Sequence, residues 1–303
     1  MSIRRLSFFT IVLTFGFMVM GGFVAASSSG TACGSEWPLC NGKLIPPLEG
    51  DALIVFLYRA MGVVQGVMTV MLVVNVKRAK VSATIRKVAN WMMSLFVVQM
   101  LLGAASVWFE VHTFVVAVHA ILAMLYLACV LVIWSQSVRF HYFSLNYEQH
   151  KMISRHLTVF LGLVLLTLFV EAYVRHGLME GTSSQPLQTV LTLLWIISAG
   201  YSLVLTNWSY AKDWGAGLQK RFKFVSLTVI LQGLFGLLSM KTSDGIGWIL
   251  FHVAVGIVLF ALVVEARLFM SAIVIKKGKL ILFSTKQISS KKTGKTRKYL
   301  GQP

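Results

Sequence analysis

Eight separate apolar runs, each roughly 20 residues long, limit the folds that are open to this chain. An α-helix of about 20 residues crosses the ~30 Å hydrocarbon core of a bilayer with its backbone groups paired. Charged residues make up only 13% of the chain, against about 25% in an ordinary soluble domain. We therefore predict an all-α polytopic membrane protein with eight transmembrane helices. The predicted spans are 7–27, 52–76, 89–108, 114–134, 157–174, 187–207, 222–240 and 247–271.

The first apolar run has one property of a signal peptide, because Arg4 and Arg5 precede it. The apolar core of a signal peptide is about 7–15 residues long, and this run is longer. The segment Ala25-Ala26-Ser27 is only a weak cleavage site. We therefore expect the first run to be an uncleaved span.

The basic residues predict the orientation of the chain. The net charge is +18. With the N-terminus inside, most Lys and Arg residues fall on the inner side, and the outer side carries only Lys43, Arg59, Arg175 and Lys241. This is the positive-inside rule. It predicts an integral protein of a bacterial-type cytoplasmic membrane with both termini inside. We expect no nucleic acid as a partner, since no binding motif accompanies the charge, and we assign the basic C-terminal tail to anionic membrane lipid.

A polar pattern inside the apolar runs occurs twice. Gln99-x-x-x-Gly103 precedes His119, and Gln232-x-x-x-Gly236 precedes His252 at the same spacing. Each copy closes a set of four spans, so both sets insert in the same orientation. The pattern predicts two parallel four-helix repeats related by an axis along the membrane normal.

This duplication divides the chain into four parts. An N-terminal four-helix half (1–135) is followed by a cytoplasmic linker (136–156) and a C-terminal four-helix half (157–275). The remaining segment is a basic cytoplasmic tail (276–303), which we expect to be disordered.

The two repeated histidines are the main candidates for a binding site. An ionisable residue within a membrane helix is costly and by default indicates function. A neutral imidazole is a common ligand of haem iron. The alternative is a histidine that forms hydrogen bonds across helices. Because His119 and His252 occupy equivalent positions, we favour ligation of haem iron by both.

Other polar residues near the outer helix ends offer further contacts to a haem. Tyr58 could bind ferric iron as tyrosinate or lie in the interfacial aromatic belt. Arg59 and Arg175 could each bind a haem propionate or extend to lipid headgroups. Glu171 is either the partner of Arg175 four residues later or a carboxylate that handles protons.

Cys33 and Cys40 lie in the first outer segment, where the compartment is oxidising and a disulfide is plausible. The bond would be either a structural staple or a redox-active pair that is easily reduced. Two thiols without a nearby histidine make only half of a zinc site, so we do not expect zinc.

Two segments carry a resemblance to a known family. GSEWPLCNGKLIPP (34–47) resembles the first outer loop of the heme A synthases, whose pattern is a Cys followed by W-P-L-C-[HN]-G and a Pro. EAYVRHG (171–177) resembles their G-A-Y-V-R-H stretch. The similarity, together with the eight spans, covers residues 1–275.

The resemblance implies a function. Heme A synthases oxidise the C8 methyl of heme O to the formyl of heme A, with heme O as substrate in one half and haem b in the other. By resemblance, the N-terminal half would hold the substrate haem and the C-terminal half haem b. His119 and His252 match the later histidine of each half. Heme O synthase or terminal oxidase assembly proteins are the protein partners that it implies.

The chain also departs from the family pattern. Where the family has E-x-x-H-R, this chain has Val55 in place of the catalytic glutamate and Tyr58 in place of the histidine, followed by Arg59. The second early histidine falls at about Leu194. The catalytic residue is therefore unassigned. The sequence leaves three functions open. They are a divergent heme A synthase-type oxidoreductase, a non-catalytic haem-binding paralogue that acts in haem handling or oxidase assembly, and a structural membrane protein that has lost haem.

Overall fold

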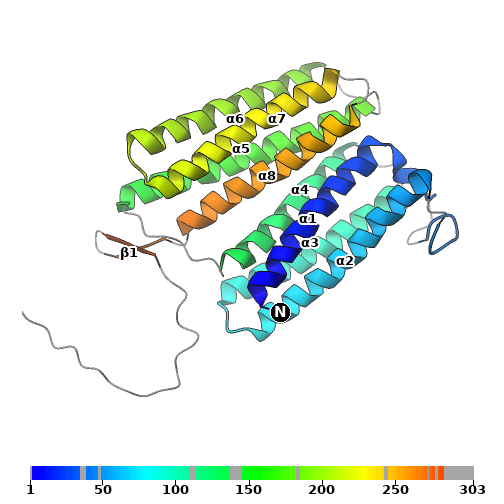
Figure 1. The fold of residues 1–303 in the computed structure, drawn as a ribbon, viewed down its shortest axis with the longest axis horizontal. Coiled ribbons are helices and arrows are strands. Elements are labelled where there is room, and N and C mark those ends of the chain that lie inside the picture. The colour runs from blue at the N-terminus through cyan, green and yellow to red at the C-terminus, as the bar shows by residue number, and fades with distance from the viewer. Residues whose placement is uncertain are drawn as a thin grey trace, which may run out of the picture.

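A computed structural model describes most of the chain (Figure 1). The described residues are 2–34, 39–46, 49–108, 113–136, 145–179, 181, 185–241, 245–271, 273–276 and 279–282. Eight long helices account for nearly all of them. They are α1 (Ile3–Ala26), α2 (Gly50–Arg78), α3 (Ala83–Trp108), α4 (Thr113–Ser135), α5 (Tyr147–Met179), α6 (Gln185–Ala211), α7 (Ala216–Lys241) and α8 (Ile246–Ser271).

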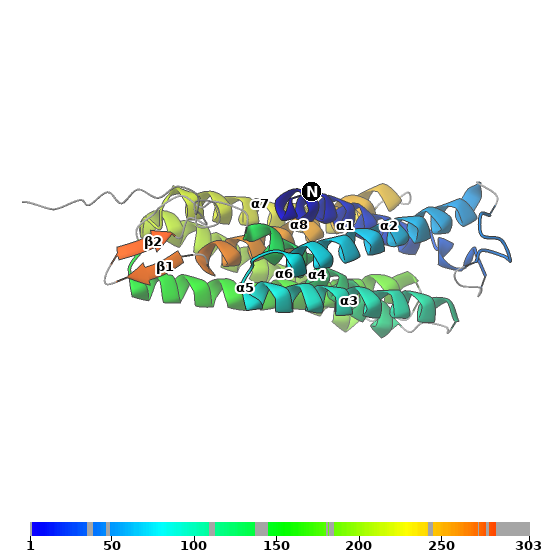
Figure 2. The same ribbon diagram turned by 90° about the horizontal axis from the view of Figure 1, so that it is seen from below.

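Within these ranges, all eight helices are long and apolar enough to cross a membrane. They lie side by side along one direction, with the loop after α1 at one end of the molecule (Figure 2). Large apolar side chains such as Val63, Leu101, Leu193 and Phe251 are exposed on their outer faces, which is the arrangement expected of a surface in contact with lipid. The prediction of a polytopic helical membrane protein is therefore confirmed.

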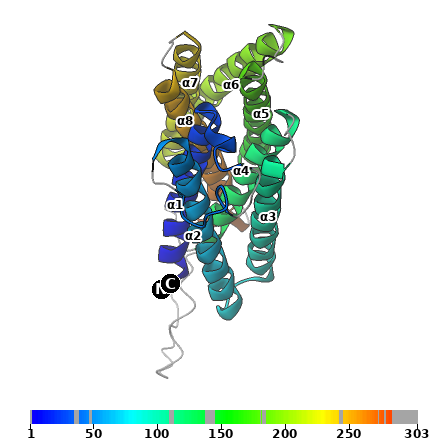
Figure 3. The same ribbon diagram turned by 90° about the vertical axis from the view of Figure 1, so that its right-hand side faces the viewer.

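The eight helices form two layers of four (Figure 3). One layer holds α7, α8, α1 and α2 in that order, and the other holds α6, α5, α4 and α3, as the helix contacts require. Across the layers α7 packs on α6, α8 on α5, α1 on α4 and α2 on α3. Every helix contact within the first four therefore has a counterpart within the last four. This pattern agrees with the predicted parallel repeat, which stays a prediction.

Helix α5 begins well before its predicted span and takes in the second part of the predicted linker. Its start is a capping box, in which Gln149 N donates to Asn146 Oδ1 at 2.8 Å and Asn146 N donates to Gln149 Oε1 at 3.1 Å. One face of the beginning of α5 is buried, because Ile153 and Leu157, together with Leu145 just before the helix, pack in one cluster with residues of α6, α7 and α8.

A buried polar network joins α1, α2 and α4 in the first half. Gln65 Nε2 donates to Thr14 Oγ1 at 3.0 Å and to the Tyr126 hydroxyl at 2.7 Å. Thr69 Oγ1 donates to the Gln65 carbonyl and lies 2.6 Å from the Tyr126 hydroxyl, so the tyrosine donates to the threonine. Hydrogen bonds of this kind hold membrane helices together where the hydrophobic effect cannot.

The segment after α8 contains a short antiparallel hairpin of β1 (Ile273–Lys276) and β2 (Lys279–Leu282). The predicted disorder of the tail was therefore wrong for its first residues. The run IVIK and the run KLIL flank Lys-Gly, and β-branched runs on either side of such a dipeptide favour a hairpin. The rest of the predicted tail, 283–303, lies outside the described residues.

Candidate functional site

The duplicated Gln and His residues meet across neighbouring helices in both halves. Gln99 Nε2 on α3 donates to the main-chain carbonyl of His119 on α4 at 2.8 Å. His252 Nδ1 on α8 donates to the main-chain carbonyl of Gln232 on α7, also at 2.8 Å. The repeated spacing is therefore the sequence signature of a contact between the last two helices of each half.

The glycine of each copy lies beside the imidazole. A Cβ atom placed on Gly103 would lie 4.0 Å from His119 Cε1, and one on Gly236 would lie 3.1 Å from His252 Cε1. Small residues at these positions let the two helices approach closely. The ring in the second half is packed more tightly than the ring in the first.

In the second half, His252 belongs to a buried group of three polar side chains. The whole His252 residue is 4% exposed. Its Nε2 atom pairs with Glu171 Oε1 on α5. Gln232 Nε2 donates to Glu171 Oε2 at 3.0 Å and also lies 3.2 Å from His252 Nε2. Glu171 is therefore paired with both other side chains, whereas the buried Gln232 Oε1 atom has no hydrogen-bond partner among the described residues.

The hydrogen bonds define the protonation of the His252 ring. A carbonyl oxygen only accepts, so Nδ1 carries a proton and donates it to Gln232. Metal-bound histidines commonly donate one ring nitrogen to a backbone carbonyl and leave the other for the metal. Here the other nitrogen is Nε2, and Glu171 occupies its free side.

A cavity of about 430 Å³ adjoins this group and is lined by residues of α5, α6, α7 and α8. Its polar lining is Glu171, Arg175, Gln188 and Ser239, and the rest is aliphatic. Arg175 donates to Ser239 Oγ from both terminal nitrogens at 3.4 Å. Its Nε atom is buried and has no hydrogen-bond partner in the described part of the chain.

Helix α6 contributes no imidazole to the second half. At the position expected for the family's histidine lies Leu194, and the neighbouring Trp195 fills the space between α6 and α7. The Trp195 indole nitrogen donates to the Val229 carbonyl at 2.9 Å. A Cβ atom on Gly233 would lie 2.0 Å from the Trp195 ring, so the indole rests directly on the glycine backbone.

His119 is less enclosed than His252. Its side chain is partly buried, and its ring forms no hydrogen bond within the part of the chain that the structure describes. Both of its ring nitrogens are therefore available to a ligand. Across the described ranges, no group of three or more His, Cys, Asp or Glu side chains could hold a metal ion, so protein ligation of iron here would rest on single imidazoles.

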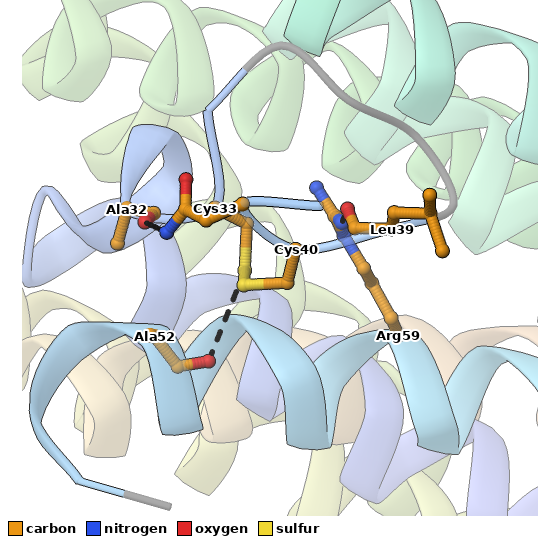
Figure 4. Close-up of a disulfide and its surroundings, with 7 residues drawn as sticks. Ala32, Cys33, Leu39, Cys40, Ala52 and Arg59 are labelled. Carbon is orange, nitrogen blue, oxygen red and sulfur yellow. Dashed lines mark hydrogen bonds between the residues drawn. A yellow bond between two sulfur atoms is a disulfide. The ribbon is translucent and has the colours of Figure 1, made fainter. Parts of the chain in front are cut away.

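The other predicted contacts of a haem lie near α1 and the outer loop. The ring of Tyr58 stacks on Phe17 of α1 with ring centroids 4.7 Å apart, and it also lies against Gly21. Arg59 Nη1 donates to the Leu39 carbonyl at 2.5 Å. Arg59 therefore fastens the outer loop to α2 (Figure 4). No contact joins Tyr58 to His119 among the described residues.

Cys33 and Cys40 form a disulfide that lies against the first turn of α2. Cys33 Sγ contacts the Ala52 carbonyl at 3.9 Å, as Figure 4 shows. Val55, which takes the place of the family's glutamate, is 3% exposed and packs with both cysteines. The catalytic position of the resemblance is thus an apolar contact beneath the disulfide.

Comparison with known proteins agrees with this geometry. Residues 4–179 match the COX15-CtaA family, described as cytochrome oxidase assembly protein. That match covers more than half of the chain. The chain belongs to the heme A synthase family. The predicted family membership is therefore confirmed.

Curated heme A synthases are similar over different lengths. The protein of Exiguobacterium sp. is 30% identical over 182 residues, which are 57% of this chain and 58% of that protein. The protein of Exiguobacterium sibiricum is 30% identical over 43% of this chain and 46% of its own length. The protein of Staphylococcus haemolyticus is 25% identical over 86% of this chain and 93% of its own length.

The residues of the two halves differ in how well they fit a haem. In the first half, His119 offers an imidazole whose nitrogens form no hydrogen bond with the described residues. In the second half, Arg175 could bind a propionate, but both nitrogens of His252 are already bonded within the protein. The donor set fits a haem in the first half and does not fit iron ligation in the second.

Glu171 is the residue whose partner the sequence did not predict. The sequence offered either a pair with Arg175 or a carboxylate that handles protons, and the structure pairs Glu171 with His252. The available signal was a carboxylate within the apolar part of α5 and an imidazole within the apolar part of α8.

Proposed function

We propose that this protein binds a haem in the membrane through His119 and acts as a heme A synthase-like oxidoreductase. The observation that carries the proposal is the imidazole of His119 beside Gly103, which forms no hydrogen bond among the residues that the structure describes, in a chain of this family. Heme O, when bound, would supply the C8 methyl group that the reaction converts to a formyl group.

The side chains of the first half have defined tasks in this proposal. His119 holds the iron from α4, and the Gln99 amide fixes the main chain at His119 by its hydrogen bond. Tyr58 lies at the outer end of α2, where its stacking on Phe17 fixes the ring. The disulfide loop, which Arg59 fastens to α2, separates this end of the helix bundle from water.

A second function is haem handling without oxidation, and one observation favours it. Val55 carries no proton acceptor, and it packs beneath the disulfide. The carboxylate one turn earlier, that of Asp51, accepts a hydrogen bond from Ser29 at 3.0 Å and is exposed. A general base contributes about 10²–10⁴ to a rate. A protein with this site would carry haem b or heme O toward a heme O synthase or an oxidase assembly protein.

The composition of the bound haem distinguishes these functions. The protein is purified in mild detergent, its absorption spectrum is recorded, and the haem is extracted and chromatographed. Heme A or a hydroxylated heme O would support the oxidoreductase. Bound haem b or unmodified heme O alone would support haem handling. A preparation without a Soret band would contradict both.

We also propose that both termini lie on the inner side and that the two four-helix halves are parallel repeats. The support is the excess of basic residues on one side and the matching helix contacts of the two halves. Alkaline phosphatase fused after residue 110 should be active, and the same fusion after residue 275 should be inactive. The reverse pattern would contradict the orientation.

A further inference from the structure

We infer that the second four-helix half does not ligate haem iron, because Glu171 takes the position beside His252 that a metal ion would occupy. The inference rests on the proposed function in one respect, namely that the first half binds a haem. The exclusion of iron from the second half is argued independently. It gives the protein one haem per chain, and it assigns Glu171, His252 and Gln232 to an internal polar site.

The first step of the argument is the direction of the His252 ring. Nδ1 donates to the Gln232 carbonyl, so Nε2 is the only ring nitrogen that could bind iron. That atom contacts a carboxylate oxygen of Glu171. Iron could reach Nε2 only if this oxygen left, and the carboxylate is fixed from its other side by the Gln232 amide at 3.0 Å.

The second step is the packing around the three side chains. A Cβ atom on Gly236 would lie 3.1 Å from the His252 ring, and one on Gly256 would lie 3.0 Å from Gln232 Nε2. The ring and the amide are therefore held in contact with helix backbone on one side each. Neither side chain can retreat to make room for a porphyrin beside Nε2.

The third step is the cost of breaking the group. A buried carboxylate and a buried imidazole satisfy each other, and separating them leaves an uncompensated polar group in an apolar bundle. In the first half no such partner competes for His119, because the ring forms no hydrogen bond among the described residues. The two halves have the same helix arrangement but different chemistry.

The fourth step is the opposite wall. The facing helix α6 presents Leu194 and Trp195, and Trp195 lies on the backbone of Gly233. A second axial ligand is therefore absent from the described residues of α6, which contain no histidine. The adjoining cavity of about 430 Å³ is large enough for a small amphipathic ligand, but it opens on the carboxylate and not on the imidazole.

The test uses two matched substitutions. His119→Gln and His252→Gln each replace an imidazole with an amide that can still donate a hydrogen bond. The second variant thus keeps a partner for Glu171 and should fold. The haem-to-chain ratio is measured in both full-length variants. We expect the ratio of His252→Gln to equal that of the wild type and the ratio of His119→Gln to fall to nearly zero.

A halved ratio in His252→Gln would overturn the inference. An unchanged ratio in His119→Gln with a loss in His252→Gln would contradict both the inference and the proposed function. If both variants keep the haem-to-chain ratio of the wild type, only the proposed function fails. The two results are therefore distinguishable.

A gain of binding tests the role of Glu171 itself. The purified protein is titrated with hemin. Glu171→Ala removes the oxygen beside Nε2 and should bind one more hemin than the wild type, whereas Glu171→Gln keeps an amide oxygen there and should not. Equal saturation of the wild type and Glu171→Ala would overturn the assignment of Glu171 as the group that excludes iron. This titration decides the inference even if the isolated protein contains no haem.

Discussion

Glu171 and His252 lie 81 positions apart in the sequence, yet the carboxylate of one pairs with Nε2 of the other inside the membrane-spanning bundle. This contact joins α5 to α8 at a position where the first half has no counterpart. His119 occupies the equivalent place on α4, and its ring has no hydrogen bond within the described residues. The duplicated sequence has therefore produced two different sites.

Removal of the His252 imidazole should destabilise the protein more than removal of its equivalent in the first half. His252→Ala leaves the Glu171 carboxylate buried without its imidazole partner, which costs about 3–5 kcal/mol. We expect His119→Ala to cost less than about 1 kcal/mol in haem-free protein, because no hydrogen bond of the ring is lost. Thermal unfolding in detergent, followed by circular dichroism, compares the two variants. Equal decreases would contradict the asymmetry.

Gly233 should not tolerate a side chain. A Cβ atom there would lie 2.0 Å from the Trp195 ring, so Gly233→Ala must displace the indole or the helix, at a cost of about 1–3 kcal/mol. The unfolding midpoint should fall, and Trp fluorescence should change.

Gly162→Ala is the matched control for this substitution, since nothing lies within 4 Å of a Cβ atom at that position. There the higher helix propensity of alanine should leave the midpoint unchanged or raise it slightly. A normal midpoint in Gly233→Ala would show that Trp195 does not pack on the glycine.

Loss of the Tyr126 hydroxyl should weaken the contact of α1, α2 and α4. Tyr126→Phe removes the acceptor of Gln65 Nε2 and the donor to Thr69, at a cost of about 1–3 kcal/mol because the partners stay buried. Tyr210→Phe, on a side chain that is 53% exposed, should have no effect on the unfolding midpoint. Equal midpoints for the two variants would contradict a structural role of the network.

The disulfide should stabilise the outer end of the first half. Replacement of Cys33 and Cys40 by serine should lower the stability by about 2 kcal/mol, as expected for a short closed loop. Treatment of the wild type with a reductant should lower its unfolding midpoint to that of the double serine variant. Cys129→Ala removes the free thiol of α4 and serves as the control. The reductant should lower its unfolding midpoint as much as that of the wild type.

The sequence was sufficient to predict the eight helices. A run of about 20 apolar residues leaves the backbone no alternative to a helix in a bilayer. The Gln and His residues of each copy meet across neighbouring helices, although Gln99 is the donor in one copy and His252 in the other, and the parallel repeat stays a prediction. The sequence also contains a signal for the beginning of α5, because Asn146 and Gln149 have the spacing of a capping box. The polar composition of that segment led to its interpretation as a linker.

The pairing of Glu171 with His252 could not be predicted in the same way. Which side chains meet depends on how each helix is rotated about its own axis. A span that is apolar on all sides gives no indication of that rotation, since lipid and protein interior are equally apolar. The position of Val55 beneath Cys33 and Cys40 was inaccessible for a related reason, because a loop of irregular backbone has no periodicity from which to derive its path.

The molar ratio of bound haem to protein chains at saturation tests the central claim most directly. The purified wild-type protein is saturated with hemin, unbound hemin is removed, and the haem is quantified against the protein. With His119 available and His252 held by Glu171, we predict a ratio of one. A ratio of two, lost by half in His252→Gln, would contradict this account of the two sites.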